Sequence, residues 1–145
     1  MDLFKAITGK NPAEYEQAAK ILVNTPNVEL FKKLVNQDEF LFDFVKNNVA
    51  KRIKQAFNAN NYKNVYSFFD FYSPSYDDVL VAVLLKYDKE NAISEMKNLF
   101  MNGTSAQKSY AIKYFSLLEK DEIQDLIPQL RELAICDDDY IEVTL

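Results

Sequence analysis

The chain lacks several residues on which common enzyme chemistry depends. It contains no histidine, no tryptophan, a single cysteine and only two glycines among its 145 residues. Without histidine, imidazole acid–base catalysis, histidine-based triads and histidine metal sites are excluded. Gly9 and Gly103 stand too far apart to form a phosphate-binding loop or a dinucleotide-binding fingerprint. These absences favour a binding role over catalysis.

Other absences indicate the cellular compartment of the chain and the classes of partner that it can bind. Cys136 has no second cysteine with which to pair, which favours the cytoplasm over an oxidising compartment. No signal-peptide pattern and no long uncharged apolar run is present, so we expect no membrane partner. A net charge of −5 disfavours nucleic acid as a partner. The hydrophobic content, 48%, is enough for one core, and we expect a single monomeric domain over residues 1–145.

What the chain does contain is a succession of amphipathic helix patterns. Asn11-Pro12 and Thr25-Pro26 each provide a capping residue followed by a proline suited to the first helical turn. Thr104 and Gln107 match the capping box, and Gly103 is predicted to end the preceding helix in the left-handed conformation. These signals predict an all-α protein with helices over residues 12–23, 26–36, 39–58, 62–72, 76–87, 89–102, 104–118 and 121–136.

Two of these segments are rich in aromatic residues. Within 39–58, Phe42 falls on the predicted core face, whereas Phe40 and Phe44 point elsewhere and indicate a helix packed between two neighbours. The core face predicted for this helix comprises Leu41, Phe42, Val45, Val49, Ile53, Ala56 and Phe57. Residues 65–72 also suit a strand by propensity, but their helical neighbours favour a helix.

The helices recur as pairs, at intervals typical of helical solenoid repeats. The stretch from Asp125 to Val143 resembles a HEAT repeat. The matching positions are Leu126, Pro128, Leu130, Leu133, Asp137, Asp139 and Ile141. Glu142 replaces the usual arginine of the family, and residues 104–118 match more loosely, with Lys108 and Ala111 at the corresponding positions.

The HEAT resemblance implies a fold and a general role. The fold would be an α-solenoid, a right-handed stack of about four antiparallel helix pairs in which each hairpin covers its neighbour. The role would be that of a scaffold or adapter between proteins. The chain stops shortly after a predicted helix start near residue 139, which leaves open whether it is the N-terminal part of a longer protein.

Aromatic residues crowd one region: Phe57, Tyr62, Tyr66, Phe68, Phe69, Phe71, Tyr72 and Tyr76. On a helix, Val65, Phe69 and Tyr72 form one face, which leaves Phe68, Phe71 or Tyr66 to pack against the next layer or to stand exposed. Packing between layers is the commoner outcome, but exposed aromatic side chains mark binding surfaces. We therefore predict partner contacts at Tyr66, Asp70, Phe71 and Tyr76.

Charged clusters offer weaker candidates. The cluster of Lys46, Lys51, Arg52 and Lys54 is compatible with a phosphate or an acidic partner, but Asp43 shares its face and we expect a solvated surface. Asp77-Asp78 and Asp137 to Asp139 lie at predicted helix starts, where acids cap free amides, and they lack calcium-loop spacing. Cys136 is interpreted as a small core residue. We predict no metal and no cofactor.

The sequence thus predicts a non-catalytic module that binds another protein or peptide. The second helix of each pair would line a concave face, over residues 26–36, 62–72, 89–102 and 121–136. A carboxylate-dependent enzyme that uses Asp70, Asp77 and Tyr76 is one alternative. A nucleic-acid-binding HEAT-like protein, similar to certain DNA-repair glycosylases, is another, and it would require a positively charged groove.

Overall fold

The computed structural model describes residues 2–129 and 131, and this part of the chain is built from helices joined by short connections. The α-helices are α1 (Leu3–Thr8), α2 (Pro12–Asn24), α3 (Val28–Asn36), α4 (Asp43–Ala56), α5 (Asp77–Tyr87), α6 (Lys89–Asn102) and α7 (Ser105–Ser116). Three 3-10 helices complete them: η1 (Asp38–Phe40), η2 (Tyr62–Phe68) and η3 (Lys120–Leu126). No strand occurs in the described ranges, which confirms the all-α prediction.

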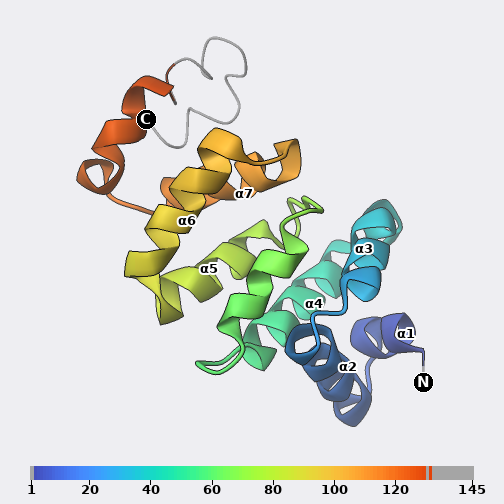
Figure 1. Cartoon of the computed structure of the whole chain (residues 1–145). Helices are drawn as coiled ribbons and strands as arrows, with labels where there is room; N and C mark the ends of the chain where they lie inside the picture. Colours follow the sequence, from blue (N-terminus) through green and yellow to red (C-terminus); the bar gives the residue numbers. More distant parts are fainter. Residues whose placement is uncertain (1, 130, 132–145) are drawn as a thin grey trace.

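The helices follow one another across the molecule, from α1 and α2 at one end to η3 at the other (Figure 1). Helix α2 packs on α4, α4 packs on α5, and α5 packs on α7. Alongside this series, α3 contacts η2, and α6 contacts both α5 and α7. Helix α5 is therefore the central element, since it touches α4, η2, α6 and α7.

Two of the predicted helix starts are confirmed and one is displaced. The Asn11 side chain accepts a hydrogen bond from the Ala13 amide at 3.1 Å, with Pro12 in the first turn of α2. Thr104 and Gln107 form the reciprocal capping box of α7. Helix α3 does not begin at Pro26, because Asn27 accepts from the Leu30 amide and acts as its cap.

Gly103 ends α6, but the predicted left-handed conformation is wrong. Its φ is −83°, an ordinary value for any residue. Glycine is required here by space, because a Cβ atom would lie 2.4 Å from the carbonyl oxygen of Leu99.

Helix α1 was not predicted from the sequence. The Asp2 side chain caps its start by accepting from the Lys5 amide at 3.2 Å, and Arg52 binds its end. The Arg52 guanidinium donates to the carbonyl oxygens of Ile7, at 2.7 Å, and Gly9, at 2.8 Å, and it stacks on the Tyr15 ring. These carbonyls belong to the C-terminal end of α1, where cations are favoured. Arg52 is therefore a structural link and not part of a solvated surface, whereas Lys51 and Lys54 are exposed as expected.

The core of the described chain is unusually aromatic. Phe69 stacks on Tyr110 with ring centroids 4.5 Å apart, and Phe68 meets Phe31 of α3 at 4.9 Å. Val65 and Phe69 are buried as predicted, and Tyr72 is half-buried. Phe68, for which the sequence left packing or exposure open, is also fully buried, because Phe31 of α3 packs against it.

The largest correction concerns residues 39–58, which do not form one continuous helix. Leu41 and Phe42 are extended and separate η1 from α4. Val49, Ile53 and Phe57 are buried as predicted, but Phe42 is 75% exposed. The helical periodicity used to assign Phe42 to the core does not extend across this break. Phe40, at 71%, and Phe44, at 61%, are also exposed and are not packed between neighbouring helices.

Asp77 and Asp78 occupy the first turn of α5, as predicted from their position. The Asp77 carboxylate is buried and accepts hydrogen bonds from the Tyr72 hydroxyl and the Asp78 amide, both at 2.7 Å. Asp78 pairs with Lys113 of α7 at 3.0 Å. The predictions for Cys136 and for Asp137 to Asp139 fall outside the described residues.

Among the described helices, none combines the length and the apolar character that crossing a lipid bilayer requires.

Candidate functional site

An open groove of about 620 Å³ lies between η2 and α6. Helix α5 contacts both of these elements. The lining residues come from η2 and from the beginning and first half of α6: Lys63, Tyr66, Asp88, Asn91, Ser94 and Glu95. Two of the four segments that the sequence assigned to a concave face, 62–72 and 89–102, therefore contribute the two walls of one groove.

The α6 wall follows from the spacing of polar residues on that helix. Asn91, Ser94 and Glu95 recur at intervals of three and four, which brings them to one side of a helix. Ala92, Met96 and Phe100 take the buried side and fix α6 against the core. The groove face of α6 is therefore polar because its apolar face is already used in packing.

Asp88 joins the two walls at one end of the groove. Its carboxylate accepts hydrogen bonds from the Tyr62 hydroxyl and from the Asn91 side-chain amide, both at 3.0 Å. Tyr62 also stacks on Tyr87, with ring centroids 5.8 Å apart. Burial and the bond to Asp88 raise the pKa of Tyr62, so its hydroxyl stays protonated as a donor. Asp88 thus acts as a structural acceptor that orients η2 relative to α6.

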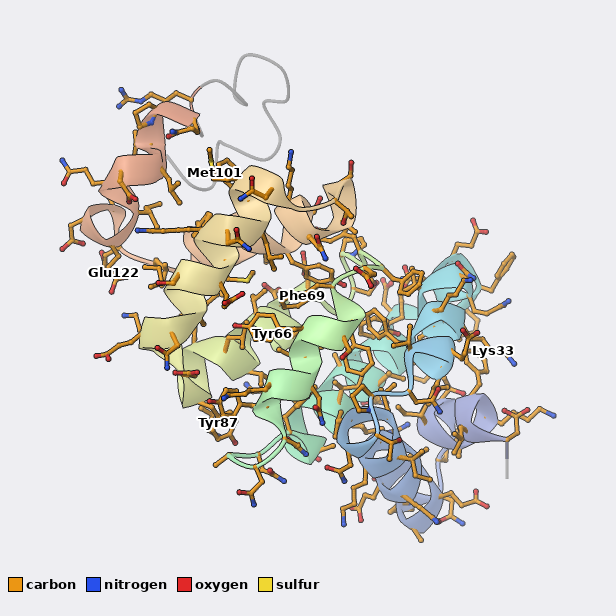
Figure 2. All side chains as sticks on the ribbon, viewed as in Figure 1. Lys33, Tyr66, Phe69, Tyr87, Met101 and Glu122 are labelled. Carbon is orange, nitrogen blue, oxygen red and sulfur yellow. The ribbon has the colours of Figure 1, made fainter. Side chains whose placement is uncertain are left out.

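Tyr66 lies on the η2 wall, and Figure 2 shows its side chain between η2 and α6. Its ring meets Phe69 edge-on with centroids 5.5 Å apart, which anchors it to the core. Burial first, and then the negative charge of Glu95, raise its pKa well above the ordinary value. Tyr66 therefore contributes a neutral hydroxyl and an aromatic face.

The groove can recognise a ligand through hydrogen bonds, because its lining contains both donors and acceptors. Lys63 and Asn91 carry donors, Glu95 carries an acceptor, and the hydroxyls of Tyr66 and Ser94 can do both. This is the kind of surface that binds polypeptide backbone and polar side chains. In the described ranges, no group of three or more acidic, cysteine or histidine side chains is arranged to hold a metal ion.

The four predicted partner contacts are not brought together. Tyr66 lines the groove, whereas Asp70 is exposed beyond the end of η2 and accepts from Gln107 at 3.1 Å. Phe71 is half-buried beneath the Lys32 ammonium, 5.7 Å from its ring centroid. Tyr76 is fully buried near Phe31 and offers no surface to a partner. This burial does not agree with its predicted role as a partner contact.

The three residues proposed for an enzyme also occupy separate environments. Asp70 is on the surface, Asp77 is bonded to Tyr72 inside the protein, and the Tyr76 hydroxyl is buried without a hydrogen-bond partner. Burial raises the pKa of Asp77, but its carboxylate lines neither of the concavities described in this section. The geometry gives them no common substrate position.

A second concavity, of about 210 Å³, lies between α2 and α4. It is bordered by Glu16, Ala19, Lys20, Arg52, Gln55 and Ala56. The Nη1 atom of the Arg52 guanidinium is already bonded to the backbone carbonyls of Ile7 and Gly9, so its N–H groups are not available to a ligand. This concavity is a weaker candidate than the groove between η2 and α6.

Sequence reasoning found Tyr66 but missed the other groove residues, Lys63, Asp88, Asn91, Ser94 and Glu95. For Asn91, Ser94 and Glu95 the signal was present in the exposed polar face of residues 89–102, a segment already assigned to the concave side. It also missed the exposure of Phe40, Phe42 and Phe44. Comparison of the chain with protein families, with curated proteins and with solved structures yields no match.

Proposed function

We propose that the chain is a non-catalytic protein-interaction module that binds a segment of another protein in the groove between η2 and α6. The observation that carries this proposal is the groove itself: it is about 620 Å³ in volume, open, and lined by side chains that can donate and accept hydrogen bonds. Tyr66 offers an aromatic face beside these polar groups, a combination typical of protein-binding surfaces.

The order of helix contacts supports a further part of the proposal, a short HEAT-like α-solenoid. The first helices of the expected pairs, α2, α4, α5 and α7, contact one another in chain order. In a solenoid of this kind the second helices form the concave side, and η2 and α6 are two such second helices. The groove would then be a segment of that concave side, which serves as a scaffold surface.

The polar character of the groove also indicates the kind of ligand. A deep apolar pocket would suit a small molecule, but Lys63, Asp88, Asn91 and Glu95 form a polar and mostly charged border. Such a border suits an extended or turn-forming peptide whose backbone groups take part in the hydrogen bonds. The proposed partner is therefore another protein or peptide.

A blocking substitution tests the proposal without disturbing the core. Ser94 is exposed on the groove wall of α6, so Ser94→Arg would fill the groove with a long side chain. Asn98→Arg is the matched control, because it adds the same charge to an exposed position of the same helix outside the groove. Each tagged variant would be used for affinity purification with mass spectrometry, followed by calorimetry with the recombinant partner.

We expect wild type and Asn98→Arg to retain the same partner, and Ser94→Arg to lose it. Equal recovery and equal affinity for all three proteins would refute binding in the groove. Circular dichroism and the thermal unfolding midpoint of each variant would establish that the helices are intact.

A further inference from the structure

The segment before α4 exposes three phenylalanine side chains, Phe40, Phe42 and Phe44, which we call the aromatic turn. Their side chains are 71%, 75% and 61% exposed, respectively. Phe42 and Phe44 stack on each other, with ring centroids 5.9 Å apart and planes inclined by 11°. The next residue, Val45, packs on the core, which fixes the position of the turn. Neighbouring exposed aromatic rings are a mark of an interaction surface.

The position of Phe42 is unfavourable for the isolated chain. It occupies the N-cap of α4, and its side chain cannot accept a hydrogen bond from the first turn. Helices α2, α3 and α7 use Asn11, Asn27 and Thr104 at the same position. An apolar cap in place of Ser, Thr, Asp or Asn lowers helix stability. Phe42 therefore lowers local stability without burying its ring in the core.

Four other rings of the described chain lie beneath its own cations, whereas the rings of the aromatic turn do not. Lys33 lies over Phe4 at 5.0 Å, and Arg52 lies over Tyr15 at 3.6 Å. Within residues 2–129 and 131, no Lys or Arg is positioned over the rings of the aromatic turn. These rings are free to receive a cation from another molecule.

The charges around the aromatic turn are predominantly negative. Asp38, Glu39 and Asp43 belong to the same segment of chain, and Lys46 is the one base between residues 38 and 46, which gives this segment a net charge of −2. The Lys46 ammonium lies 3.8 Å from Asp38 and 3.4 Å from Asp43, and its side chain is only 20% exposed. Glu39 is exposed and the Asp43 side chain is 95% exposed, so the rim of the turn is anionic.

This charge restricts the occupant. Residues 132–145 carry five acids and no base, so they would be repelled. A second copy of the same surface would place like charges together, and an anionic lipid surface would be repelled by the rim and by the net charge of −5. We propose that the aromatic turn binds a basic amphipathic segment of another protein. The segment's apolar side chains contact the three rings, and its Lys or Arg side chains pair with Glu39 and Asp43 or lie over the rings.

The test uses the whole chain and a library of random peptides displayed on phage. Phe42→Ser/Phe44→Ser removes two rings and gives α4 a side chain that can cap it, so loss of folding is not expected. Glu39→Gln/Asp43→Asn removes the rim charge and keeps the rings. Ser94→Arg blocks the groove between η2 and α6 and serves as the control that separates this surface from the proposed function.

Peptides enriched on wild type should carry Lys or Arg beside apolar residues and should bind Ser94→Arg equally well. Their dissociation constants should rise about tenfold or more with the phenylalanine variant and severalfold with the charge variant, and binding should weaken with salt. Vesicle co-sedimentation and analytical ultracentrifugation of wild type and the phenylalanine variant complete the test. The proposal would be overturned if the enriched peptides bound the phenylalanine variant as well as wild type, or if peptides that require the rings carried no basic residues. It would also be overturned if the rings were required for binding to vesicles or to a second copy of the chain.

Discussion

The buried aromatic cluster around η2 and the aromatic turn before α4 contain similar side chains in opposite surroundings. Phe68, Phe69, Tyr76 and Tyr110 are fully buried, and their rings meet those of Phe31, Tyr66 and one another. Phe42 and Phe44 meet mainly each other and face solvent. This difference shows that an aromatic residue is buried only where another helix packs against its ring. η2 lies among α2, α3 and α5, whereas in the described chain η1 packs mainly on α3.

Removing one ring from each cluster tests the contrast between the two clusters with the largest expected effect. Phe69→Ala should lower the free energy of unfolding by about 3–5 kcal/mol, because it leaves a cavity beside Tyr110. Phe44→Ala should change it by no more than about 0.5 kcal/mol, since the ring is exposed. Urea denaturation followed by circular dichroism measures both. Equal effects would show that the two clusters do not differ in the way described.

A second pair of variants compares two buried hydroxyls inside the cluster around η2. The Tyr110 hydroxyl donates to the Phe71 carbonyl at 2.6 Å and accepts from the Ser73 amide at 3.3 Å. Tyr110→Phe should therefore lower the free energy of unfolding by about 1–3 kcal/mol. The Tyr76 hydroxyl has no partner, so Tyr76→Phe should be neutral or stabilising. The same denaturation experiment distinguishes them, and a larger loss for Tyr76→Phe would contradict the assignment.

A third prediction compares the buried acid of this cluster with an exposed acid of the aromatic turn. Burial raises the pKa of Asp77 above its ordinary value of 3.8, although the bond from Tyr72 and the charge of Lys113 oppose the shift. The folded state then keeps the proton to a higher pH than the unfolded state. Stability consequently falls as the pH rises from about 4 through the raised pKa, and becomes constant with respect to this group above it.

Asp77→Asn cannot lose that proton, so its stability relative to wild type should improve over the same pH range. Asp43→Asn, at an exposed position of the aromatic turn, provides the baseline for pH effects elsewhere in the chain. Free energies of unfolding measured between about pH 4 and pH 7 provide the test. The difference in free energy of unfolding between Asp77→Asn and wild type could instead stay constant with pH, or the variant could become relatively less stable as the pH rises. Either result would show that burial does not disfavour the Asp77 charge.

The elements predicted well from the sequence are those whose determinants are local. Asn11 with Pro12 fixes the start of α2, and Thr104 with Gln107 fixes the start of α7, because each motif acts within one turn. Helix α1 also has a local signal, the Asp2 side chain that accepts from the Lys5 amide, and this signal was overlooked. The Arg52 side chain that binds the C-terminal carbonyls of α1 lies on α4, so that contact could not be predicted locally. Local signals therefore located most helices but not their long-range partners.

The same reasoning explains what was missed at the two surfaces. The polar face of residues 89–102 was visible in the sequence, but only the distance between η2 and α6 makes it a groove. Phe42 was assigned to the core because an apolar residue fitted the period of a continuous helix, and nothing local marked the extended backbone at Leu41 and Phe42. Phe68 was buried by Phe31, a residue on another helix. Exposure depends on such tertiary neighbours, which periodicity does not encode.

The substitution Phe42→Ser measures most directly whether the aromatic turn is retained for binding at the expense of stability. Serine can cap α4, so the free energy of unfolding should rise by about 0.5–1 kcal/mol. In the same protein preparation, the affinity for basic peptides selected on wild type should fall about tenfold. A variant that is less stable than wild type, or that binds those peptides equally well, would contradict the account.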